Sequence, residues 1–420
     1  MSASTVAASI SGRTPTSPDR SARLPRPIAF WAMAAIFVLF TAASSAPSPL
    51  YVVYQQEWRF SATTLTVVFA VYVVGLLGSL LIVGALSDYV GRRPVLAAAV
   101  ALEAVALVLF IAAGGVTILA VARLAQGIAT GAALTTLGAA LVDLNPAHAP
   151  GRAGAVNGVA PLAGLALGGL GCGALVQLAP APTHLVYALL LAGMALAAVL
   201  VARMPETSAR RRGGLSSLAP RVRIPARLRA DVYGLVPILV ASWALGGLYL
   251  SLGPSVAASL FGLHNHLVGG LVVTLLCGTG AATAFVLRAH PTDQVLRGAA
   301  IMLASGMLVT LTGVEVHAAA LAGAGTVIAG VGFGASALGS FGTLARIAAP
   351  EERGELFAVA YVISYLAFSV PAVMAGFAST SVGLRTTAVV YGVGVVALGF
   401  AALAAQREIA RRSQPHLLPS

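Results

Sequence analysis

Charged residues are scarce in this sequence. Only 9% of its 420 residues are Asp, Glu, Lys or Arg, whereas an average soluble domain has about 25%. A soluble fold needs polar groups over its surface, so this scarcity excludes a soluble enzyme and a disordered chain. Hydrophobic residues make up 58% of the chain, which is enough for about twelve membrane-spanning helices of ~20 residues each. The composition therefore indicates a polytopic membrane protein in contact with a lipid bilayer.

Lysine is absent, and cysteine nearly so. All 25 basic residues are arginine, against 13 acidic residues, which gives a net charge of +12. These arginines lie in short loops between apolar runs, so the positive-inside rule explains them better than a nucleic-acid partner. Cys172 and Cys277 lie in apolar runs without a CxxC partner, so neither a metal site nor a disulfide framework is expected. We expect no cofactor.

Twelve apolar runs predict an all-α polytopic membrane protein with two pseudo-symmetric six-helix bundles. The expected organisation is a disordered cytoplasmic tail at 1–27, an N-terminal bundle at 28–203, a basic cytoplasmic linker at 204–231, a C-terminal bundle at 232–405 and a cytoplasmic tail at 406–420. The expected spans are 28–50, 62–86, 95–114, 117–142, 154–178, 183–203, 232–256, 266–288, 296–315, 318–344, 356–380 and 383–405.

The distribution of arginine tests this layout. With both termini inside, 22 arginines fall on the inner side, only Arg59 and Arg385 fall outside, and Arg123 lies within a span. A miscounted helix would exchange the sides downstream and destroy this asymmetry, so both termini are expected in the cytoplasm. Pro146 and Pro350, in the loops after the fourth and tenth spans, are 204 residues apart. Six spans per half fit a parallel repeat about an axis along the membrane normal.

The sharpest motif lies between the second and third spans. Gly91 allows the positive φ of a short turn, and Pro94 suits the first turn of the next helix. Asp88 can face a helix amino terminus or an arginine. An ordinary loop that only fixes topology is the alternative interpretation. The residues that make up the motif are Gly84, Asp88, Gly91, Arg92 and Arg93.

This segment resembles the loop 2–3 signature of the major facilitator superfamily, with a departure at Tyr89, where the family usually has a basic residue. The resemblance implies a latch between the cytoplasmic ends of the second and eleventh spans in the outward-open state. The corresponding loop at 288–298 is a poor copy, so we expect a latch that is mainly one-sided.

Two further motifs resemble the drug/proton antiporter (12-span) branch of that family. Arg123 and Gln126 in the fourth span match its R-x-x-Q-G pattern, and an arginine reaching out to the membrane interface is the alternative. In the fifth span, Pro161, Gly164 and Gly168 match the branch's glycine-rich motif only in part. Close helix packing explains those glycines equally well.

Glu103 is the one acidic residue expected well inside a span. If a titrating side chain couples protons to transport, Glu103 is therefore the candidate, and a structural glutamate bonded to a neighbouring helix is the equal alternative. We expect no direct pair between Glu103 and Arg123. The depth of Arg123 in the membrane matches instead that of the end of the first span. The residues there are Ser44, Ser45, Ser48 and Tyr51. Other candidates for a central cavity are Tyr72, Trp243, Tyr249, Ser336, Ser340, Tyr361, Ser364 and Tyr365.

The sequence thus predicts a monomeric secondary active transporter of the inner (plasma) membrane, and not an enzyme. It would move a small organic molecule by alternating access, with proton-coupled efflux as the leading hypothesis. An uptake symporter or facilitator for a small metabolite on the same fold is the alternative. A membrane sensor or assembly factor has no supporting motif. The few charges of the expected cavity suit neutral or amphipathic solutes.

Overall fold

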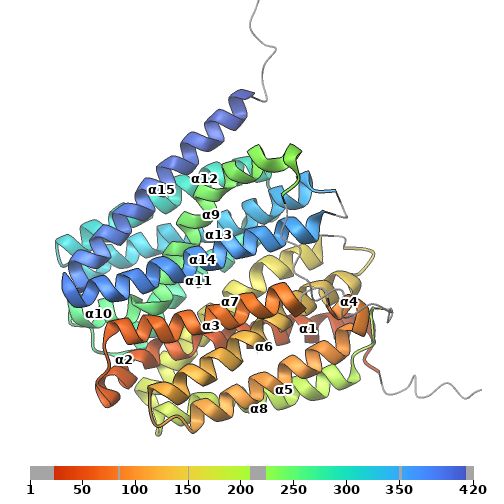
Figure 1. Ribbon diagram of the computed structural model, residues 1–420, viewed down its shortest axis with the longest axis horizontal. Coiled ribbons are helices and arrows are strands. Elements are labelled where there is room, and N and C mark those ends of the chain that lie inside the picture. The colour runs from red at the N-terminus through yellow and green to blue at the C-terminus, as the bar shows by residue number, and fades with distance from the viewer. Residues whose placement is uncertain (1–22, 84–85, 150, 209–223, 350–351, 413–420) are drawn as a thin grey trace, which may run out of the picture.

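The computed structural model describes residues 23–83, 86–149, 151–208, 224–349 and 352–412 (Figure 1). All its regular elements in these ranges are helical, and twelve helices are long and apolar enough to cross a membrane. The predicted all-α fold with twelve spans is confirmed. Residues 1–22 of the tail predicted at 1–27, residues 209–223 of the predicted linker, residues 413–420 of the predicted C-terminal tail and Gly84 of the loop motif lie outside the described residues.

The first six spans form the N-terminal bundle. Its helices are α1 (Arg26–Ser45), α2 (Pro47–Trp58), α3 (Ala62–Val83), α4 (Leu86–Val90), α5 (Arg92–Ile111), α6 (Val116–Asp143), α7 (Arg152–Leu178) and α8 (Pro182–Arg203). Helices α1 and α2 together make the first span, and the short α4 lies in loop 2–3.

The last six spans form the C-terminal bundle. Its helices are α9 (Arg229–Ser251), α10 (Gly253–Phe261), α11 (His266–Leu287), α12 (Thr292–Glu315), α13 (Ala319–Ile347), α14 (Arg353–Ser381) and α15 (Leu384–Arg412), with a 3₁₀ turn at Ala226–Leu228 before α9. The element order repeats that of the first half, including a helix that continues the first span of the bundle.

The helix bounds differ from the expected ones in three places. The first span continues past residue 50 to Trp58, because Ala46 keeps a helical conformation and Pro47 is tolerated at the start of α2. The linker expected at 204–231 ends earlier, since the seventh span begins at Ala226. The tail expected at 406–420 begins inside α15, which runs on to Arg412.

The two bundles meet along two helix pairs, α3 with α14 and α7 with α11. Glycines permit the second contact: a Cβ at Gly270 would lie 2.3 Å from the carbonyl oxygen of Gly169. In the first pair, the rings of Phe69 and Phe368 are 5.0 Å apart. These contacts lie from the middle of the helices toward α2 and α10, so we call that end of the molecule the α10 end and the opposite one the α4 end (Figure 1).

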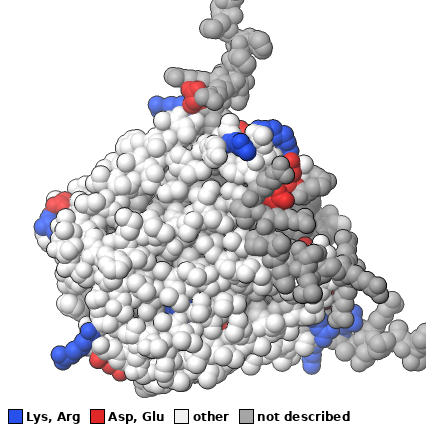
Figure 2. All heavy atoms as spheres, viewed as in Figure 1, with Lys and Arg blue, Asp and Glu red and all other residues white. Residues whose placement is uncertain are grey.

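The exposed charged side chains of the described residues gather toward the rim of the molecule. In the view of Figure 2 the blue and red side chains lie at the edges, and the surface between them is almost wholly uncharged. Large apolar side chains such as Val74, Leu196 and Met374 are at least 60% exposed on this surface. An uncharged band with outward-facing apolar side chains is what a bilayer core requires.

Candidate functional site

Arg123 lies near the middle of the N-terminal bundle, on α6, and is only 1% exposed. Its Nε donates to the Tyr51 hydroxyl at 2.7 Å, its Nη1 donates to the Ser44 carbonyl oxygen at 3.0 Å, and its Nη2 also donates to Tyr51. The guanidinium lies 5.0 Å from the ring centroid of Tyr72. The expected match with the end of the first span is confirmed, and this buried geometry is not that of an arginine reaching the membrane interface.

Gln126 joins Arg123 to Glu103. Arg123 Nη1 donates to Gln126 Oε1 at 2.7 Å, and Gln126 Nε2 donates to Glu103 Oε1 at 3.0 Å and to the Ala43 carbonyl oxygen at 3.1 Å. A guanidinium can only donate hydrogen bonds. The amide of Gln126 must therefore turn its oxygen to Arg123 and its nitrogen to Glu103. We call this chain of contacts the Arg–Gln–Glu chain.

Glu103, on α5, is fully buried. Its Oε1 is held by Gln126, whereas its Oε2 has no hydrogen-bond partner. Among the ion pairs of the described residues, none joins Glu103 to Arg123. The expectation of no direct pair therefore holds, but the sequence argument missed that one amide spans the separation. A buried carboxylate with one unpartnered oxygen offers a place for a proton.

The loop 2–3 motif forms a polar cluster at the α4 end. Arg92 Nη1 lies 2.6 Å from Asp88 Oδ1 and also donates to Ser87 Oγ at 2.6 Å, while Arg92 Nε lies 3.3 Å from Asp143 Oδ2. Thr207 Oγ1 donates to the same Asp143 oxygen at 2.9 Å. Asp88 does face an arginine, as expected, and the side chain of Arg92 is only 11% exposed.

Glu206 closes the helix end in this cluster, a role that the sequence reasoning missed. Its carboxylate accepts from the backbone N–H groups of Arg92 at 2.8 Å and Arg93 at 3.2 Å, so it caps the amino terminus of α5. Gly91 has φ of +109°, and a Cβ there would lie 2.7 Å from Glu206 Oε2. Arg93 itself donates to the carbonyl oxygen of Ala202. In the sequence, the one indication of this cap was an acidic residue, Glu206, just after the sixth span.

All of these contacts stay within the N-terminal bundle. Among the residues that the structure describes, no ion pair links one bundle to the other. The helix pairs described above bring the bundles together toward the opposite, α10 end. Among the described residues, the ion pairs of loop 2–3 therefore do not reach the eleventh span.

The fifth-span glycines pack against α1. A Cβ at Gly164 would lie 1.9 Å from Thr41 Oγ1, and one at Gly168 would lie 2.1 Å from the Ala42 carbonyl oxygen. Pro161 lies one turn earlier within α7. These contacts account for both glycines by helix packing alone.

The remaining cavity candidates separate into two groups. Trp243, Tyr361 and Tyr365 form an aromatic cluster on α9 and α14, with the Trp243 and Tyr365 rings 4.8 Å apart and those of Tyr361 and Tyr365 6.3 Å apart. The serines at 336, 340 and 364 are at most 1% exposed; Ser336 donates to the Phe333 carbonyl oxygen at 2.8 Å, and the hydroxyls of Ser340 and Ser364 have no hydrogen-bond partner. Tyr249 bonds Thr326 within that same bundle.

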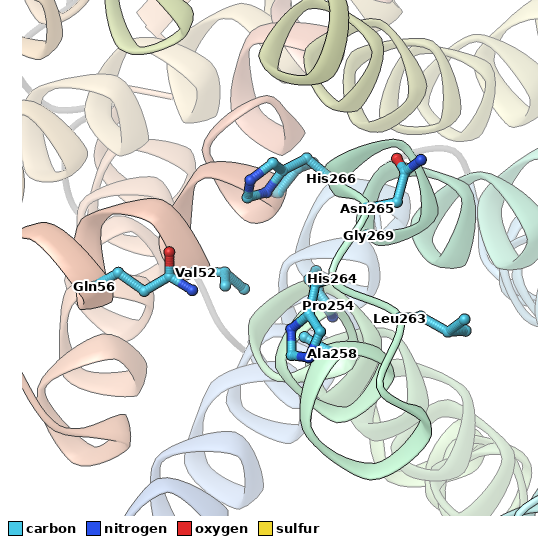
Figure 3. A pocket seen from close by; sticks show the side chains of 10 residues that line it. Val52, Gln56, Pro254, Ala258, Leu263, His264, Asn265, His266 and Gly269 are labelled. Atoms are coloured by element: carbon cyan, nitrogen blue, oxygen red, sulfur yellow. The ribbon is translucent and has the colours of Figure 1, made fainter.

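A cavity of about 270 Å³ lies between the bundles at the α10 end. Figure 3 shows Val52 and Gln56 on α2 across this space from His264 and His266, which precede and begin α11. Within the described parts of the chain, no group of three or more His, Cys, Asp or Glu side chains could hold a metal ion.

Twelve spans in two related six-helix bundles, with a polar cluster in loop 2–3, are the architecture of a membrane transporter. The sequence profile of the Major Facilitator Superfamily matches residues 32–371. The chain belongs to this superfamily.

Solved structures support the fold, although no curated protein matches the sequence. The human organic anion transporter MFSD10 (TETRAN) is 17% identical, with a TM-score of 0.67, over 90% of this chain and 100% of that one. A bacterial homologue of the human lysosomal transporter Spinster is 14% identical, with a TM-score of 0.71, over 94% and 98%. A mutant of the nucleoside transporter NupG is 12% identical, with a TM-score of 0.68, over 91% and 100%.

Proposed function

We propose that this transporter is a proton-coupled exporter of a small organic molecule. The observation that carries the proposal is the fully buried Glu103, whose Oε2 has no partner and whose Oε1 is linked through Gln126 to Arg123. Proton coupling needs a group that binds and releases a proton inside the membrane. Arginine stays protonated, so within the Arg–Gln–Glu chain Glu103 is the residue that can bind and release a proton.

Glu103 has no rival among the acidic residues that the structure describes. It is the only one of them that is buried, and the others lie at helix ends or in loops. An ionised Glu103 compensates the buried charge of Arg123 through the shared amide, and a protonated Glu103 leaves that charge to Tyr51 and Tyr72. Proton binding thus changes the balance of forces on α1, to which Arg123 and Gln126 are both bonded.

The way the bundles meet supports transport by alternating access. The contacts at the α10 end hold that end together, and loop 2–3 at the α4 end is free to engage the eleventh span when the bundles rock the other way. We propose that Asp88 and Arg92 bias this equilibrium, as expected from the resemblance of their motif to the family signature.

Export is the direction favoured by Arg123 and Gln126, whose pattern resembles the drug/proton antiporter branch. The fifth-span motif adds no weight to it, because Gly164 and Gly168 are explained by packing against α1. Uptake of a small metabolite therefore stays the second candidate. The aromatic cluster of Trp243, Tyr361 and Tyr365 would suit a neutral or amphipathic substrate.

The proposed orientation places both termini, the α4 end and residues 204–231 in the cytoplasm, with the transporter acting as a monomer in the inner membrane. A single cysteine at position 216, in a chain with Cys172 and Cys277 replaced, tests this orientation. An impermeant thiol reagent should label it in inverted vesicles only, and labelling from outside intact cells would reverse the topology.

Replacement of Glu103 by glutamine tests the coupling role, because it keeps the shape and removes the proton site. In proteoliposomes, Glu103→Gln should lose accumulation of substrate driven by a pH gradient, while downhill exchange continues. Glu103→Asp should retain part of the activity. The matched control is Glu57→Gln, the same change at an exposed position of α2, which should behave as wild type. Uphill transport by Glu103→Gln would refute the proposal. A comparison of transport in inverted and in right-side-out vesicles would distinguish export from uptake.

A further inference from the structure

A second cavity, of about 370 Å³, lies inside the C-terminal bundle toward the α10 end. Its walls are apolar side chains of α9 to α13 and α15, among them Leu275, Met307 and Leu311. Its volume is within the range of small-molecule sites. Neither the packing of the bundles nor the proposed proton site uses this space.

Helix α11 separates the cavity from the N-terminal bundle. Gly270 and Val273 on one face of α11 contact Gly169 of α7. Leu271 and Leu275 lie on the other face and line the cavity. The cavity is therefore distinct from the path between the two bundles, although the two share α11 as a wall.

Three hydroxyl groups supply the polar part of the cavity wall. Thr326 Oγ1 donates to the Ala322 carbonyl oxygen at 2.9 Å, and Thr310 Oγ1 donates to the Gly306 carbonyl oxygen at 3.0 Å. Thr326 has spent its single proton, so Tyr249 must be the donor in its 2.8 Å contact with Thr326. All three protons are then used within the protein. What the wall offers to a ligand is oxygen lone pairs, which accept a hydrogen bond.

The repeat explains why the space exists. In chain order Tyr249, Thr310 and Thr326 stand on the spans that correspond to those of Tyr51, Glu103 and Arg123. By position from the helix end, Arg123 of α6 corresponds to Val327 of α13, the neighbour of Thr326. Counted back from the last residue of each helix, Gly323 of α13 corresponds to Leu119 of α6, which is fully buried.

We infer that this cavity is a binding site for a lipophilic small molecule with one hydrogen-bond donor, such as a phenol or an alcohol. The apolar walls would take the hydrocarbon body, and the hydroxyl of Tyr249 or Thr310 would accept the donor. Such a molecule could come from the bilayer, as a lipid with a free hydroxyl, or from solution, as an added solute.

The probe is a phenol with a photoactivatable diazirine on a short alkyl chain, applied to the full chain in phosphatidylcholine nanodiscs. Crosslinks should map to cavity-lining residues of α11, α12 and α13, and 4-tert-butylphenol should compete with them. The methyl ether 4-tert-butylanisole has nearly the same shape without a donor, so it should compete at least ten-fold less well. Equal competition by the two would overturn the donor requirement.

Gly323→Leu should fill the site and lower crosslinking at least ten-fold. A Cβ at Gly323 meets only Leu275 Cδ1, at 4.0 Å, so the larger side chain can enter the cavity without a clash. The control is Gly394→Leu on α15, an exposed helical glycine with no atom within 4 Å of its Cβ position; its crosslinking should be unchanged. Tyr249→Phe should weaken competition by the phenol about five-fold, as for one lost hydrogen bond. Undiminished crosslinking in Gly323→Leu would mean that the probe only partitions into lipid, and would refute the site.

Analysis of the protein as purified from cells distinguishes the two possible sources of the ligand. A lipid with a free hydroxyl that stays bound in native mass spectra of wild type, and is absent from Gly323→Leu, identifies the bilayer as the source. A site that is empty on purification and takes up the phenol identifies a solute. An empty site that also fails to bind the phenol refutes the inference.

Discussion

The two six-helix bundles have the same helix order but place charge differently inside the membrane. The N-terminal bundle holds the buried Arg–Gln–Glu chain, bonded to Tyr51 of its first span. The buried polar side chains on the corresponding spans of the C-terminal bundle are uncharged, and they include the hydroxyl groups of Tyr249, Thr310 and Thr326. One backbone arrangement therefore supports a charged interior in one half and a neutral, hollow interior in the other. We therefore place the proposed proton coupling in the first half.

The ion pairs at the α4 end show a second difference. Arg92 at the start of α5 pairs with Asp143 at the end of α6, whereas Asp293 at the start of α12 pairs with Arg346 near the end of α13. The two pairs lie at corresponding positions of their bundles, but the acidic and basic residues have changed places. Arg92 is 11% exposed and part of a cluster, while both partners of the second pair are more than half exposed. Exposed single pairs contribute little to stability, so the pair in the N-terminal bundle should stabilise the protein more than the pair in the C-terminal bundle.

Removal of the buried arginine should have the largest effect on stability. Arg123→Met leaves the oxygens of Tyr51, Ser44 and Gln126 without their donor and Glu103 without its counter-charge. Loss of one partner from a buried charged network costs about 3–5 kcal/mol. Thermal unfolding of the purified variant should show this loss, and Arg123→Met with Glu103→Gln should recover part of it. The control is Arg288→Met in the exposed region after α11, which should change stability by less than about 0.5 kcal/mol. Equal losses of stability in Arg123→Met and Arg288→Met would contradict the proposed difference between the bundles.

Charge removal in the loops should affect transport more than stability. Asp88→Asn weakens the pair with Arg92, and a bias of about 1–2 kcal/mol shifts a two-state conformational equilibrium roughly ten-fold. We expect roughly ten-fold slower transport at normal expression. Asp293→Asn, the same change in the exposed pair of the C-terminal bundle, should be nearly silent. Similar transport rates for the two variants, measured in proteoliposomes, would show that loop 2–3 only fixes topology.

Loss of the helix cap in loop 2–3 should have the smallest effect. Glu206→Gln keeps one acceptor for the N–H groups of Arg92 and Arg93 but removes the charge. A charge at a helix amino terminus is worth about 0.3–1 kcal/mol, so a modest fall in melting temperature is expected. Glu206→Ala should lower it further, because both N–H groups lose their acceptor. Melting curves of the two variants with no difference from wild type would show that Glu206 does not cap α5.

Much of the fold could be predicted from the sequence, because membrane spans follow from composition and from the arginine distribution. Twelve spans were found where twelve were expected. The boundary errors have local causes: Pro47 looks like a breaker but starts α2, and nothing apolar announces that α15 continues to Arg412.

The site was harder to predict. The contact of Arg123 with the end of the first span could be predicted from depth along the helices. The bridge through Gln126 could not, because it depends on how α5 and α6 are placed against each other, which helix length does not give. Glu206 was missed because its partners are backbone groups of residues more than one hundred positions away. The cavity of the C-terminal bundle was missed because it results from small side chains.

Infrared difference spectroscopy of Glu103 tests the central claim most directly. Spectra of the purified transporter, recorded as pH is stepped across the range in which it works, should contain a carboxylic C=O band that changes with pH. That band should be missing in Glu103→Gln and kept in Glu57→Gln. A pH-dependent band of this kind that survives in Glu103→Gln would place the proton elsewhere and contradict the account.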